Sequence, residues 1–351
     1  MEISYSPVIN FQSVIGREPR STIFQVEEIE KLAKERILVT GAGGTIGSKI
    51  TEFLSKIEDL EFLATDRDEG ALHSLSLKLN SKALFDQPNI ELLDIKDLIG
   101  IRKCIERFKP TLVIHAAALK HLSALQRQPR EALLTNVFGT ANLIDVSIDN
   151  QIKKFINIST DKVANYTSIL GYTKKLAELY VAKIRNDFKL DYTSCRFGNV
   201  FNSRGSVIET FIHQIQTNKP ITLTDKTIDR FFMSVEEAAH LTLKSSLLNA
   251  GDVHIFDMGK PVSLESVIDK LQMLIGKRSP IIITGLRDGE KTSEVLFSKS
   301  EVASETKDPR ITFTNLTEEL MDSEEIISQI QNRDELNLLK TISVYSKSYA
   351  I

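Results

Sequence analysis

Three glycines with a regular spacing follow a short apolar stretch near residue 40. Residues 37–40 (ILVT) have strand character, and Gly41, Gly44 and Gly47 come next, at the start of a helix-like segment. In such a unit the first glycine permits a tight turn, the second lets backbone amides approach a pyrophosphate, and the third allows close helix–strand packing. The phosphates then lie at the positive end of the helix. The pattern predicts a dinucleotide site.

A second acidic strand end follows at the distance that such a site requires. Asp66 ends the stretch 61–66 and is placed to meet the adenosine ribose, and Arg67 beside it could pair with a 2′-phosphate. This favours NADP, with NAD as the open alternative. Asp94 and Ile95, after the third strand-like run, are where contacts with the adenine would fall.

The elements that must position these residues alternate regularly along the first 200 residues. Strand-like runs lie at 37–40, 61–65, 90–93, 112–114, 155–158 and 192–195, with helix-length segments such as 48–57 and 130–148 between them. Near-continuous apolar strands separated by helices indicate a parallel sheet covered on both faces. The predicted fold class is therefore α/β, a Rossmann-like doubly wound parallel sheet.

Four regions are expected along the chain. They are an N-terminal extension (1–35, with a short helix at 26–34), a nucleotide-binding domain (36–200), a smaller mixed substrate-binding lobe interleaved with it (201–315) and a helical tail (316–351). In the lobe we expect a helix at 207–217 and strands at 221–224 and 253–256.

Composition excludes several classes of protein. The 351 residues carry a net charge of −3, which argues against general binding of nucleic acids. No apolar run reaches the length of a membrane span, and residues 1–20 lack the basic and apolar regions of a signal peptide. The two cysteines, Cys104 and Cys195, have no zinc spacing, and no metal site is expected. A cytoplasmic protein without membrane insertion is expected.

Further short blocks occur in one order along the chain. They are HAAALKH (115–121), STDK (159–162), GYTKKLAE (171–178), RFGNV (196–200), SRGSVI (203–208), RFFM (230–233) and GLRDGEK (285–291). Together with the glycine turn and Lys174 they resemble the extended short-chain dehydrogenase/reductase superfamily. Within it, they resemble the CapD-like nucleotide-sugar 4,6-dehydratases of polysaccharide biosynthesis, over about residues 14–315. GREP at 16–19 resembles the linker after the membrane region of longer relatives, so we expect the soluble catalytic part standing alone.

The resemblance implies a complete set of cofactor and substrate contacts. The cofactor residues would be Gly41, Gly44, Thr45, Ile46, Gly47, Asp66, Arg67, Asp94, Ile95, Ala116, Ala117, Ala118 and Lys174. The residues around a UDP-sugar would be Lys120, His121, Asn199, Arg204, Arg230, Arg287 and Glu290. Arginines suit a diphosphate, and a carboxylate suits ribose hydroxyls.

A 4,6-dehydration needs a transient ketone at C4, a base at C5 and an acid for the departing C6 hydroxyl. Asp161 and Lys162 follow a strand, where ligands bind in open parallel sheets. A protonated Asp161 can serve as the acid and Lys162, with a lowered pKa, as the base. Thr160 can hydrogen-bond the C4 oxygen, and Lys174 can hold the nicotinamide ribose.

Three positions depart from the family's usual pattern. Leu170 replaces the tyrosine of the Tyr-x-x-x-Lys motif, in keeping with one branch of the family that has methionine there. Gln126 and Asp288 stand where Glu and Pro are usual. The group that removes the C4 hydroxyl proton is therefore open, with Asp161 relayed through Thr160 as the candidate. Tyr172 should face elsewhere, because it is two residues from the required helical position.

The resemblance favours a UDP-N-acetylglucosamine 4,6-dehydratase that retains the configuration at C5, with inversion left open. A nucleotide-sugar 4-epimerase is the nearer alternative, although it needs the tyrosine that Leu170 replaces. A non-catalytic NADP-binding regulator is the remote one. A homo-oligomer, at least a dimer, is expected, with residues 130–148 and 170–185 paired across a two-fold axis through apolar positions such as Leu176, Leu179 and Tyr180.

Overall fold

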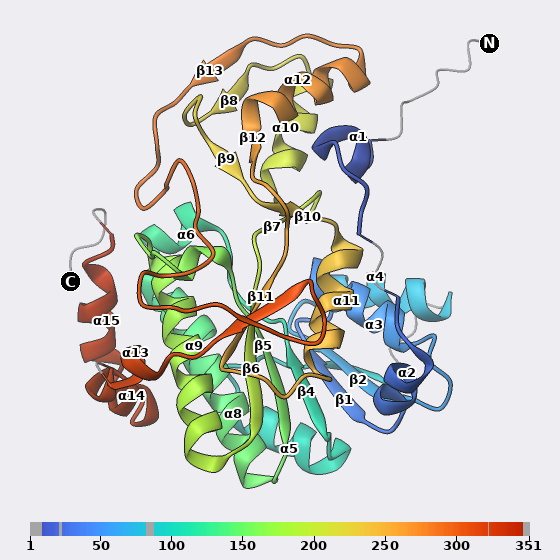
Figure 1. Cartoon of the computed structure of the whole chain (residues 1–351), viewed down its shortest axis with the longest axis vertical. Helices are drawn as coiled ribbons and strands as arrows, with labels where there is room; N and C mark the ends of the chain where they lie inside the picture. Colours follow the sequence, from blue (N-terminus) through green and yellow to red (C-terminus); the bar gives the residue numbers. More distant parts are fainter. Residues whose placement is uncertain (1–8, 21–22, 82–87, 322, 347–351) are drawn as a thin grey trace.

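A computed structural model of the chain describes residues 9–20, 23–81, 88–321 and 323–346. Within these residues the central sheet has nine strands (Figure 1). In spatial order they are β14 (Ser304–Glu305), β15 (Ile311–Thr314), β11 (Val253–Phe256), β6 (Asp191–Arg196), β5 (Lys154–Ile158), β4 (Leu112–His115), β1 (Arg36–Thr40), β2 (Glu61–Asp66) and β3 (Ile90–Leu92).

The pairing of these strands gives the predicted doubly wound sheet. From β3 to β11 every pair is parallel, and at one edge β15 pairs antiparallel with both β11 and β14. The order reverses between β1 and β4, which is the switch point where such sheets bind ligands. The carboxyl ends of β1, β4 and β5 therefore meet at one place. The Rossmann-like α/β fold is confirmed.

Helices cover both faces of the sheet, as the buried strands require. Leu38 of β1 packs in one apolar cluster with α5 (Leu98–Phe108), α8 (Thr140–Asp149) and α9 (Ile169–Phe188). Its neighbours Ile37 and Val39 pack in another with α2 (Val26–Ala33), α3 (Thr45–Leu54), α4 (Glu69–Asn80) and α11 (Val235–Ser245). Within the described residues, no helix is both long enough and apolar enough to span a bilayer.

The segment predicted as one helix at 130–148 is built from three pieces. α6 (Leu122–Arg127) precedes it, α7 (Pro129–Ala132) starts it, and a π-helical stretch (Leu133–Gly139) leads into α8. Asn136 in the π-helical stretch is buried and both accepts a hydrogen bond from Leu119 N and donates one to Leu119 O. The stretch therefore holds the segment after β4 in place.

A smaller lobe lies beyond the carboxyl ends of the strands and has its own apolar cluster (Figure 1). It contains α1 (Phe11–Ile15), β7 (Asn199–Val200), α10 (Val207–Gln216), β8 (Ile221–Leu223), β9 (Asp229–Arg230), β10 (Phe232–Met233), β12 (Val262–Ser263), α12 (Leu264–Ile275) and β13 (Ile281–Ile283). Between these pieces the chain returns to the sheet through α11 and β11. The lobe thus closes one end of the sheet.

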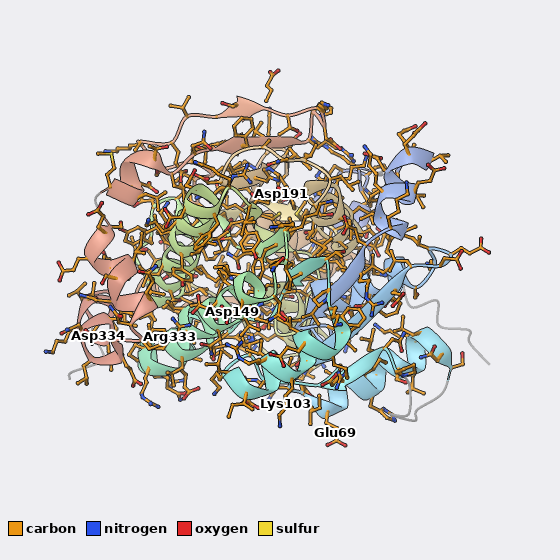
Figure 2. All side chains as sticks on the ribbon, turned by 90° about the horizontal axis from the view of Figure 1, so that it is seen from below. Glu69, Lys103, Asp149, Asp191, Arg333 and Asp334 are labelled. Atoms are coloured by element: carbon orange, nitrogen blue, oxygen red, sulfur yellow. The ribbon has the colours of Figure 1, made fainter. Side chains whose placement is uncertain are left out.

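The tail forms three helices, α13 (Thr317–Met321), α14 (Glu324–Gln331) and α15 (Glu335–Ser343), which lie against α9 (Figure 1). Leu338 and Ile342 share an apolar cluster with Leu176 and Leu179, which the sequence analysis assigned to a subunit contact. Arg333 donates to Asp145 Oδ2 at 2.6 Å and thereby ties the tail to α8. Figure 2 labels Arg333 next to Asp334 in this tail. The expected pairing surface is therefore covered by the chain's own tail.

Candidate active site

A cavity of about 770 Å³ lies at the carboxyl ends of the parallel strands. Every residue predicted to contact the cofactor lines it, as do Thr160, Lys162, Lys120, His121, Asn199 and Arg204 among the other predicted site residues. Within the described residues, no three His, Cys, Asp or Glu side chains are grouped to hold a metal ion. The cavity joins the predicted cofactor end and the predicted catalytic pair.

The glycine turn leaves no room for side chains. Gly41 has a φ of +69°, and a Cβ there would lie 2.4 Å from Ala117 N. A Cβ on Gly47 would lie 2.2 Å from Gly41 O, so α3 could not pack so close to β1. Gly44 is the N-cap residue of α3. A dinucleotide pyrophosphate fits this arrangement, because its oxygens need close backbone amides at a helix N-terminus.

Asp66 stabilises the glycine turn and also lines the cavity. Its Oδ2 accepts a hydrogen bond from Gly43 N at 2.9 Å, and its Oδ1 accepts one from Asp68 N at 3.0 Å. Arg67 also lines the cavity, with its Nη1 3.9 Å from Asp94 Oδ2. A carboxylate and a guanidinium thus stand together at the predicted adenosine end.

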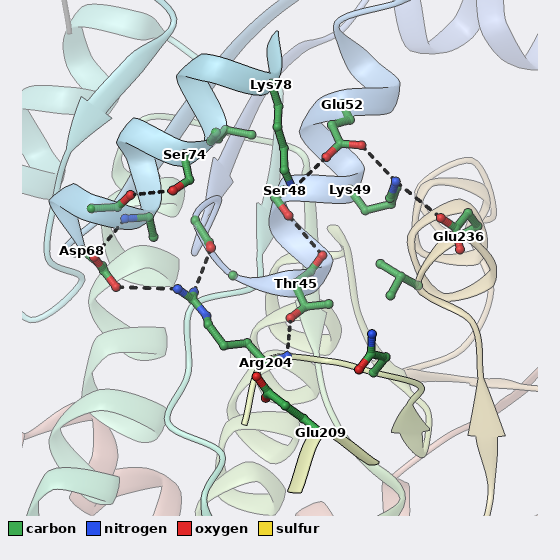
Figure 3. Close-up of a pocket in the computed structure, with 17 residues that line it drawn as sticks. Thr45, Ser48, Lys49, Glu52, Asp68, Ser74, Lys78, Arg204, Glu209 and Glu236 are labelled. Atoms are coloured by element: carbon green, nitrogen blue, oxygen red, sulfur yellow. Dashed lines mark hydrogen bonds and ion pairs between the residues drawn. The ribbon is translucent and has the colours of Figure 1, made fainter. Parts of the chain in front are cut away.

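Arg204 reaches across from the smaller lobe onto the glycine turn. Its Nη2 donates to Gly43 O at 2.9 Å, its backbone N donates to Thr45 Oγ1 at 3.2 Å, and its Nη1 lies 3.9 Å from Asp68 Oδ2. Figure 3 shows these contacts beside a second, polar cavity of about 640 Å³ between α3 and α4. The segment 203–206 therefore bridges the mouth of the site, and the predicted contact of Arg204 with UDP stays a prediction.

The predicted acid and base lie together after β5. Asp161 is fully buried, and its Oδ1 accepts hydrogen bonds from Lys162 Nζ at 2.9 Å and from Thr160 Oγ1 at 3.1 Å. Its Oδ2 is buried without a hydrogen-bond partner, in contact with Gly198. Lys162 Nζ also donates to Asn199 Oδ1 at 3.4 Å. A carboxyl, an ammonium and a hydroxyl thus meet at the end of β5. Thr160 and Lys162 line the cavity, whereas the fully buried Asp161 does not.

The pKa of Lys162 differs from the lowered value that the sequence predicted. Burial alone would lower its pKa, but the carboxylates of Asp161 and Glu294 outweigh burial and raise it. The predicted lowered pKa is therefore wrong for the protein without ligand, because Asp161 bonds the ammonium directly and Glu294 adds a second carboxylate. Sequence reasoning missed Glu294, which lies only three residues beyond the GLRDGEK block.

Burial does lower the pKa of Lys174, and it lowers that of Lys120 as well. Lys174 lies on α9, which Ser168 caps by accepting a hydrogen bond from Gly171 N, and it is 5% exposed. Burial lowers its pKa to about 8, although Glu178 acts in the opposite direction. His115 at the end of β4 is fully enclosed, and burial with the nearby Lys174 charge lowers its pKa to about 3. His115 is therefore neutral at physiological pH.

No tyrosine takes the place of Leu170. Leu170 itself lines the cavity. Tyr172 packs its ring against Tyr166 and Tyr345, with centroids 4.8 and 4.6 Å away, so it faces away from the site as predicted. Gln126 stabilises this region, since it donates to Asp288 Oδ2 and Tyr345 O and accepts from Ile169 N.

A buried ionic network supports the strand end that carries the pair. Glu178 accepts a hydrogen bond from Ser159 Oγ at 2.6 Å, next to Thr160, and another from Arg196 Nη2 at 2.7 Å. Arg196 also pairs with Glu301 at 2.7 Å. Such buried charges are tolerated only when each is paired and hydrogen-bonded. The network therefore fixes the backbone from which Thr160 and Asp161 project.

Three residues predicted for the UDP end lie outside the cavity lining. Arg230 is buried, and its guanidinium donates to the carbonyl oxygens of Asp229, Lys291 and Thr292. Glu290 accepts hydrogen bonds from Thr224 Oγ1 and from the backbone N of Arg287. These contacts shape the segment that carries Glu294. The predicted contacts of Arg230, Arg287 and Glu290 with UDP stay predictions.

Comparisons with known proteins agree with this geometry. The capsular polysaccharide biosynthesis protein CapD of Staphylococcus aureus is 34% identical over 86% of this chain, which spans about half (51%) of that relative's length. A UDP-glucose 4-epimerase of Rickettsia rickettsii is 34% identical over 76% of this chain and 79% of its own. The crystal structure of Pen from Bacillus thuringiensis is 31% identical with a TM-score of 0.71, over 80% of this chain and 88% of its own.

One family model describes most of the chain. The model of polysaccharide biosynthesis proteins matches residues 37–316, which include the glycine turn, the Asp161–Lys162 pair and Glu294. Since the match covers well over half of the chain, it identifies the family. This chain belongs to the CapD-like polysaccharide biosynthesis protein family.

Proposed function

We propose that the chain is a nucleotide-sugar 4,6-dehydratase acting on UDP-N-acetylglucosamine. The observation that carries the proposal is the buried Asp161, which is bonded to Lys162 and Thr160. These two partners line the cavity together with the glycine turn and Lys174, whereas Asp161 itself does not line it. Membership of a family of polysaccharide biosynthesis proteins supports a nucleotide-sugar substrate.

A nicotinamide cofactor fits the glycine-turn end of the cavity and would supply reversible hydride transfer when bound. Gly41, Gly44 and Gly47 would hold its pyrophosphate, Asp66 and Arg67 its adenosine ribose, and Lys174 its nicotinamide ribose. We propose NADP rather than NAD because Arg67 supplies a cation for a 2′-phosphate. Mass spectrometry of nucleotide released by heat from purified protein tests this choice.

The chain's own residues would carry out the elimination. Once C4 is a ketone, the proton at C5 is acidic, and Lys162 removes it as its free amine. The C6–oxygen bond then breaks while a protonated Asp161 gives its proton to the departing hydroxyl, which leaves as water. The hydrogen bond from Thr160 to Asp161 supports a relay for the C4 hydroxyl proton. Retention at C5 is the outcome that we favour.

A 4-epimerase is the second candidate, because relatives that carry that name are as similar to the chain as CapD is. An epimerase needs a base at C4 and no acid–base pair for C5 and C6. Leu170 lines the cavity where that base would be a tyrosine, so the site favours dehydration.

NMR of the product formed from UDP-N-acetylglucosamine in deuterated water separates the two. A dehydratase gives a 6-methyl group, a 4-ketone and deuterium at C5. Formation of the C4 epimer without solvent deuterium would instead establish the epimerase, and unchanged substrate in the presence of NADP and NAD would refute both.

A further inference from the structure

Glu294 is a buried carboxylate next to the proposed base, with no role in the reaction described above. It is 7% exposed, and its Oε1 lies 3.9 Å from Lys162 Nζ. Its Oε2 forms an ion pair of 2.6 Å with Lys291 Nζ but receives no hydrogen bond. A buried carboxylate is costly unless it is paired, so this placement needs a reason.

The surroundings of Lys162 show what Glu294 adds. Asp161 contacts the ammonium at 2.9 Å, Asn199 at 3.4 Å, and Arg230 is the further charged group near it. In the proposed reaction Asp161 carries a proton, and a neutral carboxyl no longer stabilises the ammonium that Lys162 becomes. Glu294 is then the remaining negative charge beside it.

Hydrogen bonds from two side chains hold the loop that carries Glu294 in place. Arg230 donates hydrogen bonds to the carbonyl oxygens of Lys291 and Thr292, and Lys291 Nζ donates to Asn165 O at 2.7 Å. Asn165 closely follows Lys162 in the chain. The segment 291–294 is thus fixed both to the smaller lobe and to the turn that bears the base.

We propose that Glu294 is a positioning residue that holds the Lys162 amine beside Asp161 and stabilises its ammonium form after it has taken the C5 proton. The inference rests on the proposed dehydratase function. Glu294 touches no reacting atom and acts only through Lys162.

Glu294→Gln in the full-length protein tests the inference, because the amide keeps the size of the side chain and removes its charge. An opposite charge within about 4–6 Å shifts a pKa by at least about one unit. The rise of kcat/KM with pH that reports loss of the Lys162 proton should therefore move about one unit to lower pH. KM for UDP-N-acetylglucosamine and the amount of bound nucleotide should stay unchanged.

Lys291→Met is the second variant and should shift the pH profile in the opposite direction. It removes the cation that pairs with Glu294, so the same limb of the profile should move to higher pH. Glu294→Asp keeps the charge and should restore the limb toward that of the parent. Glu237→Gln is the matched control, since Glu237 is a buried carboxylate that pairs with Arg17 rather than with Lys162. It should leave the limb in place.

A direct titration makes the test independent of turnover. The ¹⁵N resonance of Lys162 Nζ, assigned with Lys162→Arg, should titrate at lower pH in Glu294→Gln than in the parent. If the parent forms product while the limb and the resonance stay unmoved in Glu294→Gln and Lys291→Met, the inference is overturned and the proposed function stands. If the parent forms no product, the proposed function fails, and the titration still decides whether Glu294 stabilises the ammonium.

Discussion

Asp161 and Lys162 show how one buried pair can serve both as an ion pair and as an acid and base. Without ligand, Lys162 Nζ donates to Asp161 Oδ1 at 2.9 Å, and this carboxylate helps to raise the pKa of Lys162. Elimination needs the opposite assignment, a free amine and a protonated carboxyl. The unpartnered Oδ2 of Asp161 is the atom where that proton can reside.

Removing either partner should therefore stop turnover without emptying the site. General acid–base groups contribute about 10²–10⁴-fold to a rate, so Lys162→Ala and Asp161→Asn should each lose at least about 10²-fold in kcat. The nucleotide content should stay near that of the parent. The measurement is product formation from UDP-N-acetylglucosamine with bound nucleotide measured in parallel. Near-parent rates in both variants would show that Asp161 and Lys162 have only a structural role, as a helix cap and a neighbouring charge.

Lys174 should make the fold less stable than an apolar residue would. Because burial lowers its pKa from 10.5 to about 8, the folded protein holds its proton less tightly than the unfolded chain. Its destabilising effect is complete below pH 8 and disappears as the pH rises toward 10.5. Lys174→Met should thus raise the free energy of unfolding at pH 7 by about 2 kcal/mol, with a smaller gain at pH 9.

Denaturant unfolding at the two pH values measures this effect. Lys183→Met is the control, because Lys183 lies on the same helix in a surface pair with Asp187 and should change stability little. A lower stability for Lys174→Met at pH 7 would contradict the argument.

At the scale of elements, the segment 203–206 joins the smaller lobe to the glycine turn. Gly205 has a φ of +69° and packs against the ring of His121, and Lys120 Nζ donates to Ser203 Oγ at 3.3 Å. The segment is therefore held from both sides while Arg204 contacts the turn. A reaction in which hydride leaves C4 and returns to C6 gains from such a bridge, because the cofactor need not leave between the two steps.

Arg204→Ala should accordingly speed the release of bound nucleotide. A hydrogen bond from a charged donor is worth roughly 1.5 kcal/mol, which corresponds to about a tenfold faster release. Dilution into a nucleotide-free buffer followed by fluorescence of the reduced cofactor measures the rate. Lys49→Ala is the control, since Lys49 lines the neighbouring cavity but pairs with Glu52 and Glu236 (Figure 3). Equal release from both variants and the parent would show that Arg204 does not retain the cofactor.

At the scale of the whole molecule, the sequence predicted those features that are formed by residues close together in the chain. The strand–turn–helix unit at Gly41 and the pair after β5 each lie within a few residues, so local pattern and the family resemblance were enough to predict them. Glu294 was missed because the chain runs through α9, β6 and the smaller lobe before it meets Lys162. The raised pKa of Lys162 was missed because Asp161, which raises it most, was predicted to be protonated, and Glu294 adds to the rise.

The tail was predicted to be helical, but its packing against α9 was missed. Apolar residues on two sides of a helix indicate two covering layers but do not say which chain supplies the second. Here Leu338, Ile342 and Ile330 of the tail supply it for α9, and Arg333 bonds to Asn142 and Asp145 at its edge. Pairing of subunits through α8 and α9 would require the tail to leave.

Detaching α15 should therefore convert the covered face into a self-association surface. Leu338 is fully buried, and Leu338→Asp places a charge in the apolar cluster, which should lower the free energy of unfolding by about 3 kcal/mol or more. Leu336→Asp on the same helix is the matched control, because Leu336 is 72% exposed. Sedimentation velocity over a range of concentrations should show larger species for Leu338→Asp than for Leu336→Asp or the parent. If all three sediment alike while Leu338→Asp has lost stability as expected, the exposed face does not associate, and the tail stabilises the fold without guarding an interface.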